Sequence, residues 1–448
     1  MGRLFGTDGV RGIVNNDLTA DLALKLGASV ARVVKEKSNK KELTFLIGSD
    51  TRISKDMLTC AVSAGVLSEG CNVTDLGVLP TPAISYLVKY FEADGAFIIS
   101  ASHNPSEYNG IKVLDNNGFK LKESVEEEIE NYLLNDFKLN QEINNNGIYV
   151  RKDDSDILYV NHLASTIELD LSGFKIIVDT ANGAAYNTAK ILFDKLNANY
   201  ELINNEPDGL NINQNAGSTH IDRLCEKVKN GNYDIGVAYD GDADRCILVD
   251  ENGKIVDGDF IIAICGESLR KEDKLTNNAL VGTIMSNMGL LKYCEEKDIN
   301  FIATKVGDKY VLESMLDNNY ILGGEQSGHV IFKEYANTGD GELTSLQVMD
   351  AMVKENKKLS ELASVMKKYP QVMINVNVSK EGKLTFADNE NIKNKLDEIN
   401  KLLKGDGRIV VRPSGTENLI RVMLEGSDIS IITKYCETLA DFIKSELN

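Results

Sequence analysis

Short apolar runs alternate with amphipathic stretches along most of the chain, in an order that recurs three times. The first repeat has an apolar run at Leu43 to Ile47, an amphipathic stretch from Ser54 to Glu69 and a second expected strand at Asn72 to Leu76. A second helical stretch begins at Pro82, and the repeat closes with Ala96 to Ile99. Apolar runs of this length predict buried strands, and the amphipathic stretches predict helices. The alternation therefore predicts an α/β fold whose sheets are largely parallel.

Two further repeats follow, with weak sequence identity to the first. The second opens with Lys175 to Val178 and closes with Ile235 to Ala238, and the third opens with Leu280 to Thr283 and closes with Tyr320 to Leu322. Each closing strand leads into a loop rich in charged or hydroxyl side chains. Ligands of open α/β sheets bind beyond the carboxyl ends of the strands, so we expect these three loops to form sites.

The pattern changes after Pro370, which predicts a smaller α+β domain. The expected architecture is three similar α/β domains with mixed, largely parallel sheets plus a smaller C-terminal α+β domain, around a central cleft. The expected domain limits are 1–155, 156–255, 256–369 and 370–448. In the last domain, strands are expected at Val372 to Val378 and near Ile409 and Arg421, and helices at Asn389 to Leu403 and Ile429 to Leu447.

The composition indicates a soluble globular protein and argues against one that binds nucleic acid. The chain has 448 residues, of which 42% are hydrophobic and 26% are charged, as is typical of a soluble globular protein. Its formal net charge of -19 argues against nucleic acid as a partner, because such a surface repels a phosphate backbone. A phosphorylated small molecule would therefore have to be bound by a local cluster of arginine and lysine.

Cysteine spacing and hydropathy indicate the compartment. The seven cysteines, at positions 60, 71, 225, 246, 265, 294 and 436, form no Cys-X-X-Cys pair, which is typical of reduced intracellular thiols. No apolar run approaches the roughly 18 residues of a membrane span, and the polar, glycine-rich beginning of the chain has no hydrophobic signal core. We therefore expect a cytoplasmic protein with no membrane partner.

The loop that follows the second repeat concentrates negative charge. Residues 240–245 read Asp-Gly-Asp-Ala-Asp-Arg and follow a predicted strand. Three like charges at this spacing raise one another's pKa unless a cation or Arg245 offsets them. Oxygen-only ligands favour Mg²⁺ or Ca²⁺ over zinc. A solvated acidic turn is the alternative to a metal site formed by Asp240, Asp242 and Asp244.

An EF-hand loop is a second alternative for the same segment. Asp240, Asp242, Asp244 and Glu251 fall at loop positions one, three, five and twelve of that motif. Two features count against it, because Arg245 stands where the sharp turn needs glycine and a strand-like run precedes the motif in place of a helix. The sequence therefore favours a metal loop at the end of a strand.

The loop that follows the first repeat holds a candidate nucleophile. It reads Ser100-Ala101-Ser102-His103-Asn104-Pro105, and the proline prevents a helix from continuing directly out of the strand. A serine held in such a turn is able to act as a covalent carrier, although a turn serine that bonds to its own backbone is the alternative. Two cations accompany the loop, Lys112 downstream and Arg11 in the glycine-rich opening Phe5 to Gly12.

A segment near the end of the chain has the components of a phosphate site. Residues 412–417 read Arg-Pro-Ser-Gly-Thr-Glu. Arginine binds anions through bidentate charge-assisted hydrogen bonds, and a glycine-containing turn is able to direct several N–H groups at one anion. The segment therefore predicts a phosphate-binding loop to which Arg421 adds a positive charge. A plain type I or II turn is the alternative.

Taken together, these loops resemble those of the phosphohexomutase family of α-D-sugar phosphate mutases. The resemblance covers nearly the whole chain, and the loops occur in the order of that family: serine loop, metal loop, sugar loop and phosphate loop. The sugar loop is Gly323 to His329. The resemblance implies an isomerase that moves a phosphoryl group between two hydroxyls of one sugar.

Within the family, the chain is most similar to the branch that interconverts glucosamine 6-phosphate and glucosamine 1-phosphate, on the route to UDP-N-acetylglucosamine and cell-wall precursors. Three positions depart from the usual pattern. Ala243 replaces glycine, which we expect to be harmless, Lys309 replaces arginine and would lose a bidentate fork, and Asn418 replaces proline. The segments that favour this branch are Phe5 to Gly12, Ser100 to Pro105, Val306 to Val311, Gly323 to His329, Thr338 to Gly341, and Arg421 to Met423.

The resemblance implies a phosphoryl group carried on Ser102. Phosphoserine would transfer this group to the free hydroxyl of a bound sugar monophosphate, and the resulting 1,6-bisphosphate would turn round and return its other phosphoryl group to the serine. Arg11 and Arg245 would offset the charge of the group in transfer. Lys112 and His103 are the candidate acid and base, because a lysine beside a metal ion and arginines can have a depressed pKa. One Mg²⁺ would be held by Ser102, Asp240, Asp242 and Asp244.

The resemblance also implies which residues bind the substrate, a small-molecule sugar phosphate. Glu325 and Ser327 would hydrogen-bond to sugar hydroxyls, with His329 beside them and Lys305 facing the sugar. A hexosamine or hexose 1,6-bisphosphate is the expected activator, and a homodimer is common in the family. His162 and His220 match no loop and are expected to be structural or surface residues. The phosphate that is not reacting would be held by Arg412, Ser414, Gly415, Thr416 and Arg421.

Two alternative functions remain open from the sequence. A phosphomannomutase or phosphoglucomutase would use the same residues on a sugar that has a 2-hydroxyl in place of the 2-amine. A non-enzymatic Ca²⁺-binding protein would explain the metal loop but would leave the serine loop and the phosphate loop without a role.

Overall fold

The computed structural model describes residues 4–6, 8–135, 137–140, 145–403, 405–414 and 418–447. Contacts divide the chain into two units, one of residues 1–281 and 307–363 and one of residues 282–306 and 364–448. The first unit contains the α/β sheets and the second contains the smaller C-terminal sheet. The expected fold class is therefore confirmed, whereas the four domain limits stay a prediction.

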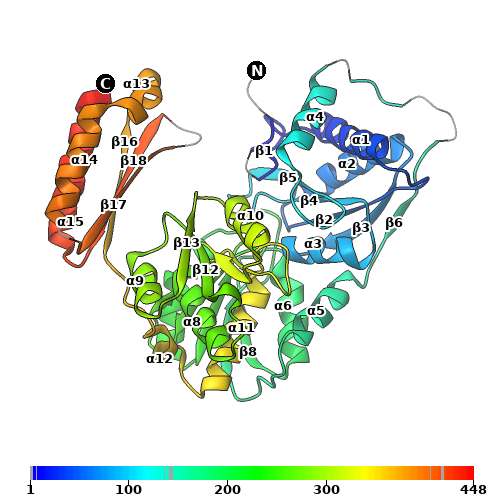
Figure 1. Cartoon of the computed structure of the whole chain (residues 1–448). Coiled ribbons are helices and arrows are strands. Elements are labelled where there is room, and N and C mark those ends of the chain that lie inside the picture. The colour runs from blue at the N-terminus through cyan, green and yellow to red at the C-terminus, as the bar shows by residue number, and fades with distance from the viewer. Residues whose placement is uncertain are drawn as a thin grey trace. The chain divides into compact units, whose positions relative to one another are not determined.

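The first sheet has six strands in the order β1-β5-β4-β2-β3-β6. The strands of the first repeat pair in parallel, as predicted, but β5 turns back antiparallel to β4 and places Lys112 opposite Ile98. Helices α1, α2 and α4 cover one face of this sheet and α3 covers the other (Figure 1). The strands are β1 (Val10–Ile13), β2 (Thr44–Ser49), β3 (Asn72–Val78), β4 (Gly95–Ile99), β5 (Tyr108–Leu114) and β6 (Tyr149–Arg151), and the helices are α1 (Ala20–Lys37), α2 (Lys55–Ser68), α3 (Thr81–Tyr90) and α4 (Glu123–Leu134).

Helices α1 and α2 pack with their backbones in close approach. The Thr19 side chain accepts a hydrogen bond from Leu22 N and so caps the first turn of α1. Where the two helices meet, a Cβ on Gly65 would lie 2.1 Å from Leu24 O, and a Cβ on Gly27 would lie 2.3 Å from Val62 O. Glycine is therefore required at both positions for the first core to close.

The second sheet has the order β11-β10-β9-β7-β8. β9 pairs in parallel with β7 and antiparallel with β10, so that the chain reverses directly after β9. Helix α7 ends at Asn232, which adopts φ 53° as a left-handed C-cap. The elements are α5 (Ser155–Ser165), β7 (Lys175–Asp179), α6 (Ala185–Lys195), β8 (Asn199–Ile203), a 3₁₀ turn (Gly217–Thr219), α7 (Asp222–Gly231), β9 (Ile235–Tyr239), β10 (Cys246–Asp250) and β11 (Ile255–Val256).

In the third α/β region, β14 pairs in parallel with β12 and antiparallel with β15. The expected strand at Tyr320 to Leu322 is displaced toward the C-terminus, because Gly323 and Gly324 pair with β15 in spite of their low strand propensity. The elements are α8 (Gly258–Lys271), a 3₁₀ turn (Thr276–Asn278), β12 (Ala279–Thr283), α10 (Asp308–Asn318), β14 (Leu322–Gly324), β15 (Val330–Phe332), α11 (Gly341–Glu355) and α12 (Leu359–Ala363).

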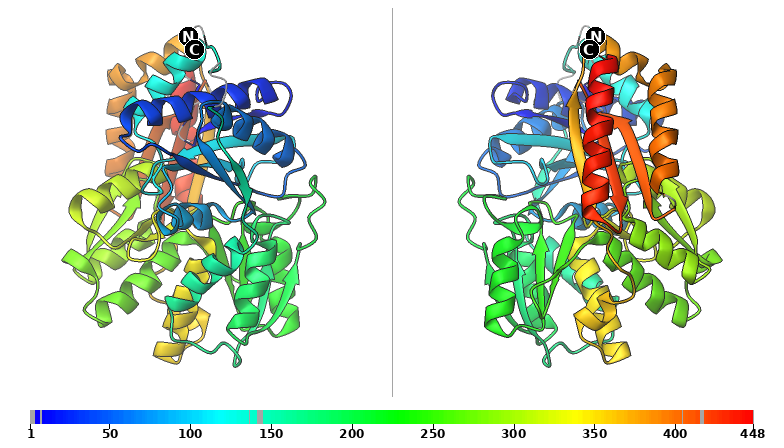
Figure 2. Two further views of the ribbon diagram at one scale, coloured as in Figure 1. Left: turned by 90° about the vertical axis from the view of Figure 1, so that its right-hand side faces the viewer. Right: turned by 90° about the vertical axis from the view of Figure 1, so that its left-hand side faces the viewer.

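The second unit contains a three-stranded antiparallel sheet in the order β16-β18-β17, and α14 and α15 pack on one face of it (Figure 2). Residues 282–306 belong to this unit because Glu425 of β18 accepts hydrogen bonds from the Asn287 side chain and from Met288 N. The elements are α9 (Met288–Glu296), β13 (Asn300–Thr304), β16 (Gln371–Asn377), α13 (Lys380–Thr385), a 3₁₀ turn (Phe386–Asp388), α14 (Glu390–Leu403), β17 (Gly407–Pro413), β18 (Leu419–Gly426) and α15 (Ile429–Leu447).

Two sequence-based expectations concern the whole chain. The seven cysteines are all free thiols. Among the described residues, every helix is too short or too polar to cross a lipid bilayer.

Replacing Gly65 by alanine tests the packing of α1 on α2. Alanine favours a helix interior by less than about 1 kcal/mol, whereas forcing a methyl group against backbone costs about 1–3 kcal/mol. We therefore expect Gly65→Ala to lower the melting temperature measured by differential scanning calorimetry. Gly173→Ala is the matched control, because a Cβ there would contact nothing within 4 Å. Equal melting temperatures for the two variants would contradict the close approach.

Candidate active site

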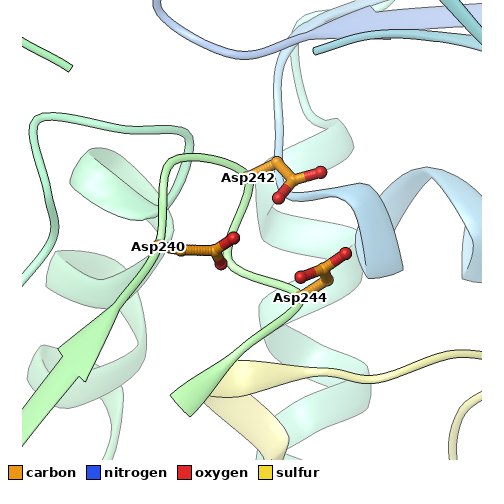
Figure 3. A group of neighbouring side chains, drawn as sticks. All are labelled: Asp240, Asp242 and Asp244. Atoms are coloured by element: carbon orange, nitrogen blue, oxygen red, sulfur yellow. The ribbon is translucent and has the colours of Figure 1, made fainter. Parts of the chain in front are cut away.

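The metal loop, residues 240–245, lies between β9 and β10, two strands whose residues are all buried. One carboxylate oxygen each of Asp240, Asp242 and Asp244 lies within 4.8 Å of the other two, and the three side chains point toward a common space (Figure 3). Ala243 adopts φ 56°. A residue other than glycine is destabilised by roughly 1 kcal/mol in that conformation. We expected the replacement of glycine by Ala243 to be harmless, but it has this small cost.

The hydrogen bonds of the three aspartates leave oxygens available for a metal ion. Asp240 accepts from Ser102 Oγ at 2.6 Å and from Arg245 N at 3.2 Å. Asp242 Oδ2 accepts from Thr81 Oγ1 at 2.6 Å. Within the described residues, Asp242 Oδ1 and Asp244 Oδ1 are buried and accept no hydrogen bond. Buried carboxylate oxygens normally have a partner, and a hard divalent cation supplies one.

The pKa values of the three carboxyls differ. Burial raises the pKa of Asp240 well above its ordinary value, and the charges of Asp244 and Asp242 raise it further. Burial and the charge of Asp242 also raise the pKa of Asp244. Burial acts in the same direction on Asp242, but Lys112 outweighs it and lowers the pKa of that carboxyl. Asp240 and Asp244 therefore need a further cation nearby if both are to be ionised at the same time as Asp242.

Lys112 lies at the centre of this charge cluster. Its Nζ is 2.7 Å from Asp242 Oδ2, 3.5 Å from Asp8 Oδ2 and 3.7 Å from Asp244 Oδ2. Burial lowers its pKa, but these carboxylates outweigh burial and raise the pKa above its ordinary value. Among the protein's own groups, carboxylates and not arginines therefore dominate the surroundings of this lysine, and a depressed pKa beside a metal ion stays a prediction.

Ser102 lies at the carboxyl end of β4 with φ 52° and is buried. Its Oγ donates to Asp240 and lies 3.3 Å from His103 Nδ1. Burial lowers the pKa of His103 to about 4, and Arg245 and Arg11 lower it in the same direction. The imidazole is therefore neutral near pH 7, with a nitrogen beside the serine hydroxyl.

A network of ion pairs that the sequence did not reveal extends from the metal loop. Lys120 Nζ lies 2.7 Å from Asp8 Oδ1 and 2.6 Å from Asp308 Oδ2. Arg11 also pairs with Asp8. One indication of this network was present in the sequence, the position of Asp8 in the glycine-rich segment Phe5 to Gly12. Nothing in the local sequence indicated that Lys120 or Asp308 takes part in it. The network links the first β-strand, β5 and the start of α10.

The sugar loop follows β14. Glu325 Oε1 accepts a hydrogen bond from Gly307 N at 3.0 Å, and Ser327 is exposed. His329 Nε2 accepts from Gly339 N at 3.2 Å. A cavity of about 360 Å³ lies beside this histidine, lined by Lys112, Lys120, Asp308, Lys309, His329 and Phe119 among others.

The phosphate-loop residues belong to the second unit. Arg412 and Arg421 are partners in the register of β17 and β18, so that two guanidinium groups extend from adjacent positions of the sheet. Like charges at such positions are destabilising unless an anion compensates them. Ser414 is buried and its N donates to Leu419 O at 2.9 Å. Lys305 is exposed in the same unit, whereas Gly415 and Thr416 lie outside the described residues.

Two histidines that matched no loop lie apart from these contacts. His162 stacks on Tyr86 with ring centroids 4.0 Å apart, and its Nε2 donates to Tyr335 O at 2.9 Å. His220 is exposed. The first is a structural residue and the second is a surface residue, as expected from the sequence.

The N-terminus of α11 supports the metal loop. Gly341 N donates to Ala243 O at 2.9 Å. The preceding residue, Asp340, caps the helix by accepting from Leu343 N and also accepts from Tyr159 Oη at 2.9 Å. Burial raises the pKa of Asp340 to about 7, although these hydrogen bonds oppose the shift.

Comparison with known proteins identifies the family. Family models for domains I, II and III of phosphoglucomutase/phosphomannomutase match residues 2–139, 158–253 and 257–369, and the model for the C-terminal domain matches residues 373–442. These models cover most of the chain. The chain belongs to the phosphoglucomutase/phosphomannomutase family.

Relatives in this family match over the full length. A phosphoglucosamine mutase of Alkaliphilus oremlandii is 50% identical over 450 residues, and one of Clostridium botulinum (strain Kyoto / Type A2) is 48% identical over 456 residues, with 100% of each chain covered. A Burkholderia thailandensis phosphoglucomutase/phosphomannomutase family protein has the same fold, with a TM-score of 0.81 at 20% identity over 100% of this chain and 98% of the other.

A second solved structure of the family fold contains ligands. The N-acetylphosphoglucosamine mutase of Aspergillus fumigatus, in complex with GlcNAc-6P and magnesium, has a TM-score of 0.73 at 16% identity, over 99% of this chain and 96% of that one. At this identity, the comparison concerns the fold alone.

Asp240→Asn tests the metal loop of this family member without an activity assay. With EDTA, we expect its melting temperature to exceed that of the wild type by roughly 1–3 °C, because one of three crowded, buried carboxyl groups is removed. With saturating Mg²⁺, the wild type gains RT ln(1 + [Mg²⁺]/Kd), about 2.7 kcal/mol at 100 times Kd, and the variant gains little. The control is Asp56→Asn on the exposed side of α2. A wild-type protein that is not stabilised by Mg²⁺ would contradict the metal site.

Asp340→Asn tests the raised pKa of the helix cap. The native protein keeps a proton on Asp340 that the unfolded chain releases near pH 4, so its free energy of unfolding decreases by up to about 1.4 kcal/mol per pH unit between pH 4 and 7. Asparagine keeps the cap and does not titrate. The melting temperature of Asp340→Asn relative to wild type should therefore rise between pH 5 and 8. A difference that is constant with pH would show that this carboxyl is ionised throughout.

Proposed function

We propose that this protein is a phosphoglucosamine mutase, an isomerase that interconverts glucosamine 6-phosphate and glucosamine 1-phosphate. The observation that carries the proposal is the hydrogen bond of 2.6 Å between Ser102 Oγ and Asp240 of the metal loop. It brings a candidate phosphoryl carrier to a group of carboxylates suited to a divalent cation. Relatives named phosphoglucosamine mutase, at 48% to 50% identity over their full length, support the choice of an amino sugar.

Ser102 is proposed to carry the transferred phosphoryl group. In the first half-reaction, the bond between its Oγ and phosphorus breaks while a bond from the free sugar hydroxyl to phosphorus forms, and the hydroxyl loses its proton. The second half-reaction reverses these changes with the other phosphate of the 1,6-bisphosphate. The burial of Ser102 supports this role, because a buried carrier protects the phosphoryl group from transfer to water.

Four side chains are proposed as partners in the transfer. Lys112 remains a cation beside Asp242 and contributes positive charge, since its raised pKa does not suit a general base. His103 is then the better candidate for accepting the proton of the sugar hydroxyl, because it is neutral near pH 7 and adjacent to Ser102 Oγ. Arg11 and Arg245 are proposed to bind phosphoryl oxygens.

Asp240, Asp242 and Asp244 are proposed to hold one Mg²⁺, which offsets charge on the phosphoryl group when it is bound. Glu325, Ser327 and His329 are proposed to bind sugar hydroxyls, with Lys305 as a further contact. Arg412, Ser414, Gly415, Thr416 and Arg421 are proposed to bind the phosphate that is not in transfer. We further propose a hexose or hexosamine 1,6-bisphosphate as activator and the cytoplasm as the compartment.

The proposal predicts turnover of glucosamine 1-phosphate with Mg²⁺ and a trace of hexose 1,6-bisphosphate. Ser102→Ala removes the phosphoryl carrier, so we expect kcat to fall by more than about 10³-fold. Ser106→Ala in the same loop makes no contact with the metal loop and should stay within about threefold of wild type. Wild-type activity in Ser102→Ala would disprove the phosphoserine mechanism.

Competition with glucose and mannose phosphates tests the sugar. Preference for glucosamine phosphate supports the proposal. Preference for glucose or mannose phosphate would keep the mechanism and identify a phosphoglucomutase or phosphomannomutase instead.

A further inference from the structure

Arg52 is a fully buried arginine beside the serine loop, at 0% exposure. It lies beyond the end of β2, and its Nε donates to Asp50 Oδ2 at 2.9 Å. An arginine has five N–H donors, and a buried one must satisfy them all. Its two terminal nitrogens donate to four backbone carbonyls, those of Ser102, Asn104 and Pro105 in the serine loop and that of Tyr108 at the start of β5.

The partner carboxylate of Arg52 holds the other side of the same serine. Asp50 Oδ2 accepts from Ser100 Oγ at 2.6 Å, and Ser100 Oγ in turn accepts from Ser102 N at 3.0 Å. Arg52 Nη2 donates to Ser102 O at 3.0 Å. Both peptide groups of Ser102 are therefore fixed, the N–H through Ser100 and Asp50 and the carbonyl through Arg52.

Asn213, in the segment between β8 and α7, donates to two of the same carbonyls as Arg52. Asn213 Nδ2 donates to Ser102 O at 2.9 Å and to Asn104 O at 3.1 Å, the same two carbonyls that Arg52 Nη2 contacts. Gly241 of the metal loop lies against the first of them, since a Cβ there would be 2.6 Å from Ser102 O. The serine carbonyl is thus enclosed by Arg52, Asn213 and the metal loop.

These contacts hold Ser102 in a backbone conformation that it would not adopt alone. Its φ of 52° is in the left-handed region, where residues other than glycine and asparagine are disfavoured. In this conformation its Oγ reaches Asp240 Oδ2 at 2.6 Å. Strain that persists at a reacting group must be maintained by the structure around it.

We infer that Arg52, through Asp50 and Ser100, is the positioning residue that aims Ser102 Oγ at the metal loop for phosphoryl transfer. The inference rests on the proposed function of Ser102. Arg52 touches no reacting atom, and three of its five hydrogen bonds go to the loop that carries the serine, with a fourth to the strand that follows it. A lysine would keep the charge opposite Asp50 but would lose the planar fork that contacts several carbonyls together.

Arg52→Lys tests this inference in the full-length enzyme. A displacement of about 1 Å at a reacting group costs about 10²-fold in rate. We therefore expect kcat to fall by about 100-fold with KM within about threefold of wild type, because the sugar and phosphate loops are unchanged. The rate of the half-reaction, measured in a single turnover as phosphoryl transfer from glucose 1,6-bisphosphate to dephosphorylated Ser102, should fall by the same factor.

Arg32→Lys is the matched control for loss of stability alone. It breaks the bidentate pair of Arg32 with the buried Glu69 in the same unit, and Arg32 and Glu69 lie on α1 and at the end of α2, outside the serine, metal and sugar loops. We expect it to lower the melting temperature while kcat per folded molecule stays within about twofold of wild type. Arg52→Lys with kcat and single-turnover rate within about threefold of wild type would overturn the inference and leave a purely structural arginine.

Ser100→Ala keeps the inference testable if Arg52→Lys does not fold, because it removes only the hydroxyl between Asp50 and Ser102 N. Its kcat should fall by about tenfold with KM unchanged, and an unchanged kcat would overturn the inference. Wild-type enzyme that takes up no phosphoryl group on Ser102 would instead disprove the proposed function. The two failures are therefore distinguishable.

Discussion

The buried ion pair between Lys112 and Asp242 is the interaction on which the site depends. Both side chains are at most 2% exposed, and their charged atoms lie 2.7 Å apart. Removing two charges from water costs several kcal/mol per ion unless each is paired and hydrogen-bonded. Here the hydroxyl of Thr81 completes the shell of Asp242, and Asp8 completes that of Lys112. The pair ties β5 of the first sheet to the metal loop of the second.

Around this pair the charges are balanced only in part. Asp240 and Asp244 have raised pKa values, and oxygens of Asp242 and Asp244 accept no hydrogen bond within the described chain. A group of carboxylates of this kind is stabilised by positive charge, which a divalent cation or the neighbouring arginine and lysine side chains can supply. The cations gathered beside these carboxylates, Lys112, Arg11 and Arg245, explain how a protein of net negative charge can bind a phosphorylated ligand.

The sequence predicted the strands that end at the serine and metal loops because short apolar runs followed directly by turn residues are typical of buried strands. It also indicated which loops hold the candidate site residues, since Ser102 and the three aspartates follow those strands directly and the structure brings Ser102 to Asp240. It missed Asp8, Lys120 and Arg52, each of which looks like an ordinary surface charge until its partner is known. Their decisive partners lie far away along the chain, at 50 positions for Arg52 and Ser102 and at 188 positions for Lys120 and Asp308, and no local pattern encodes such separations.

Residue types, the order of strands and helices, and the presence of four loops were determined by the sequence alone, because they depend on local periodicity and on the chemistry of each side chain. The protonation preference of Lys112, the left-handed backbone of Ser102 and the carboxylate oxygens left open to a cation were decided only by the tertiary structure. Each of these properties is set by burial and by charges that meet through space. Such quantities exist only after distant segments have packed together.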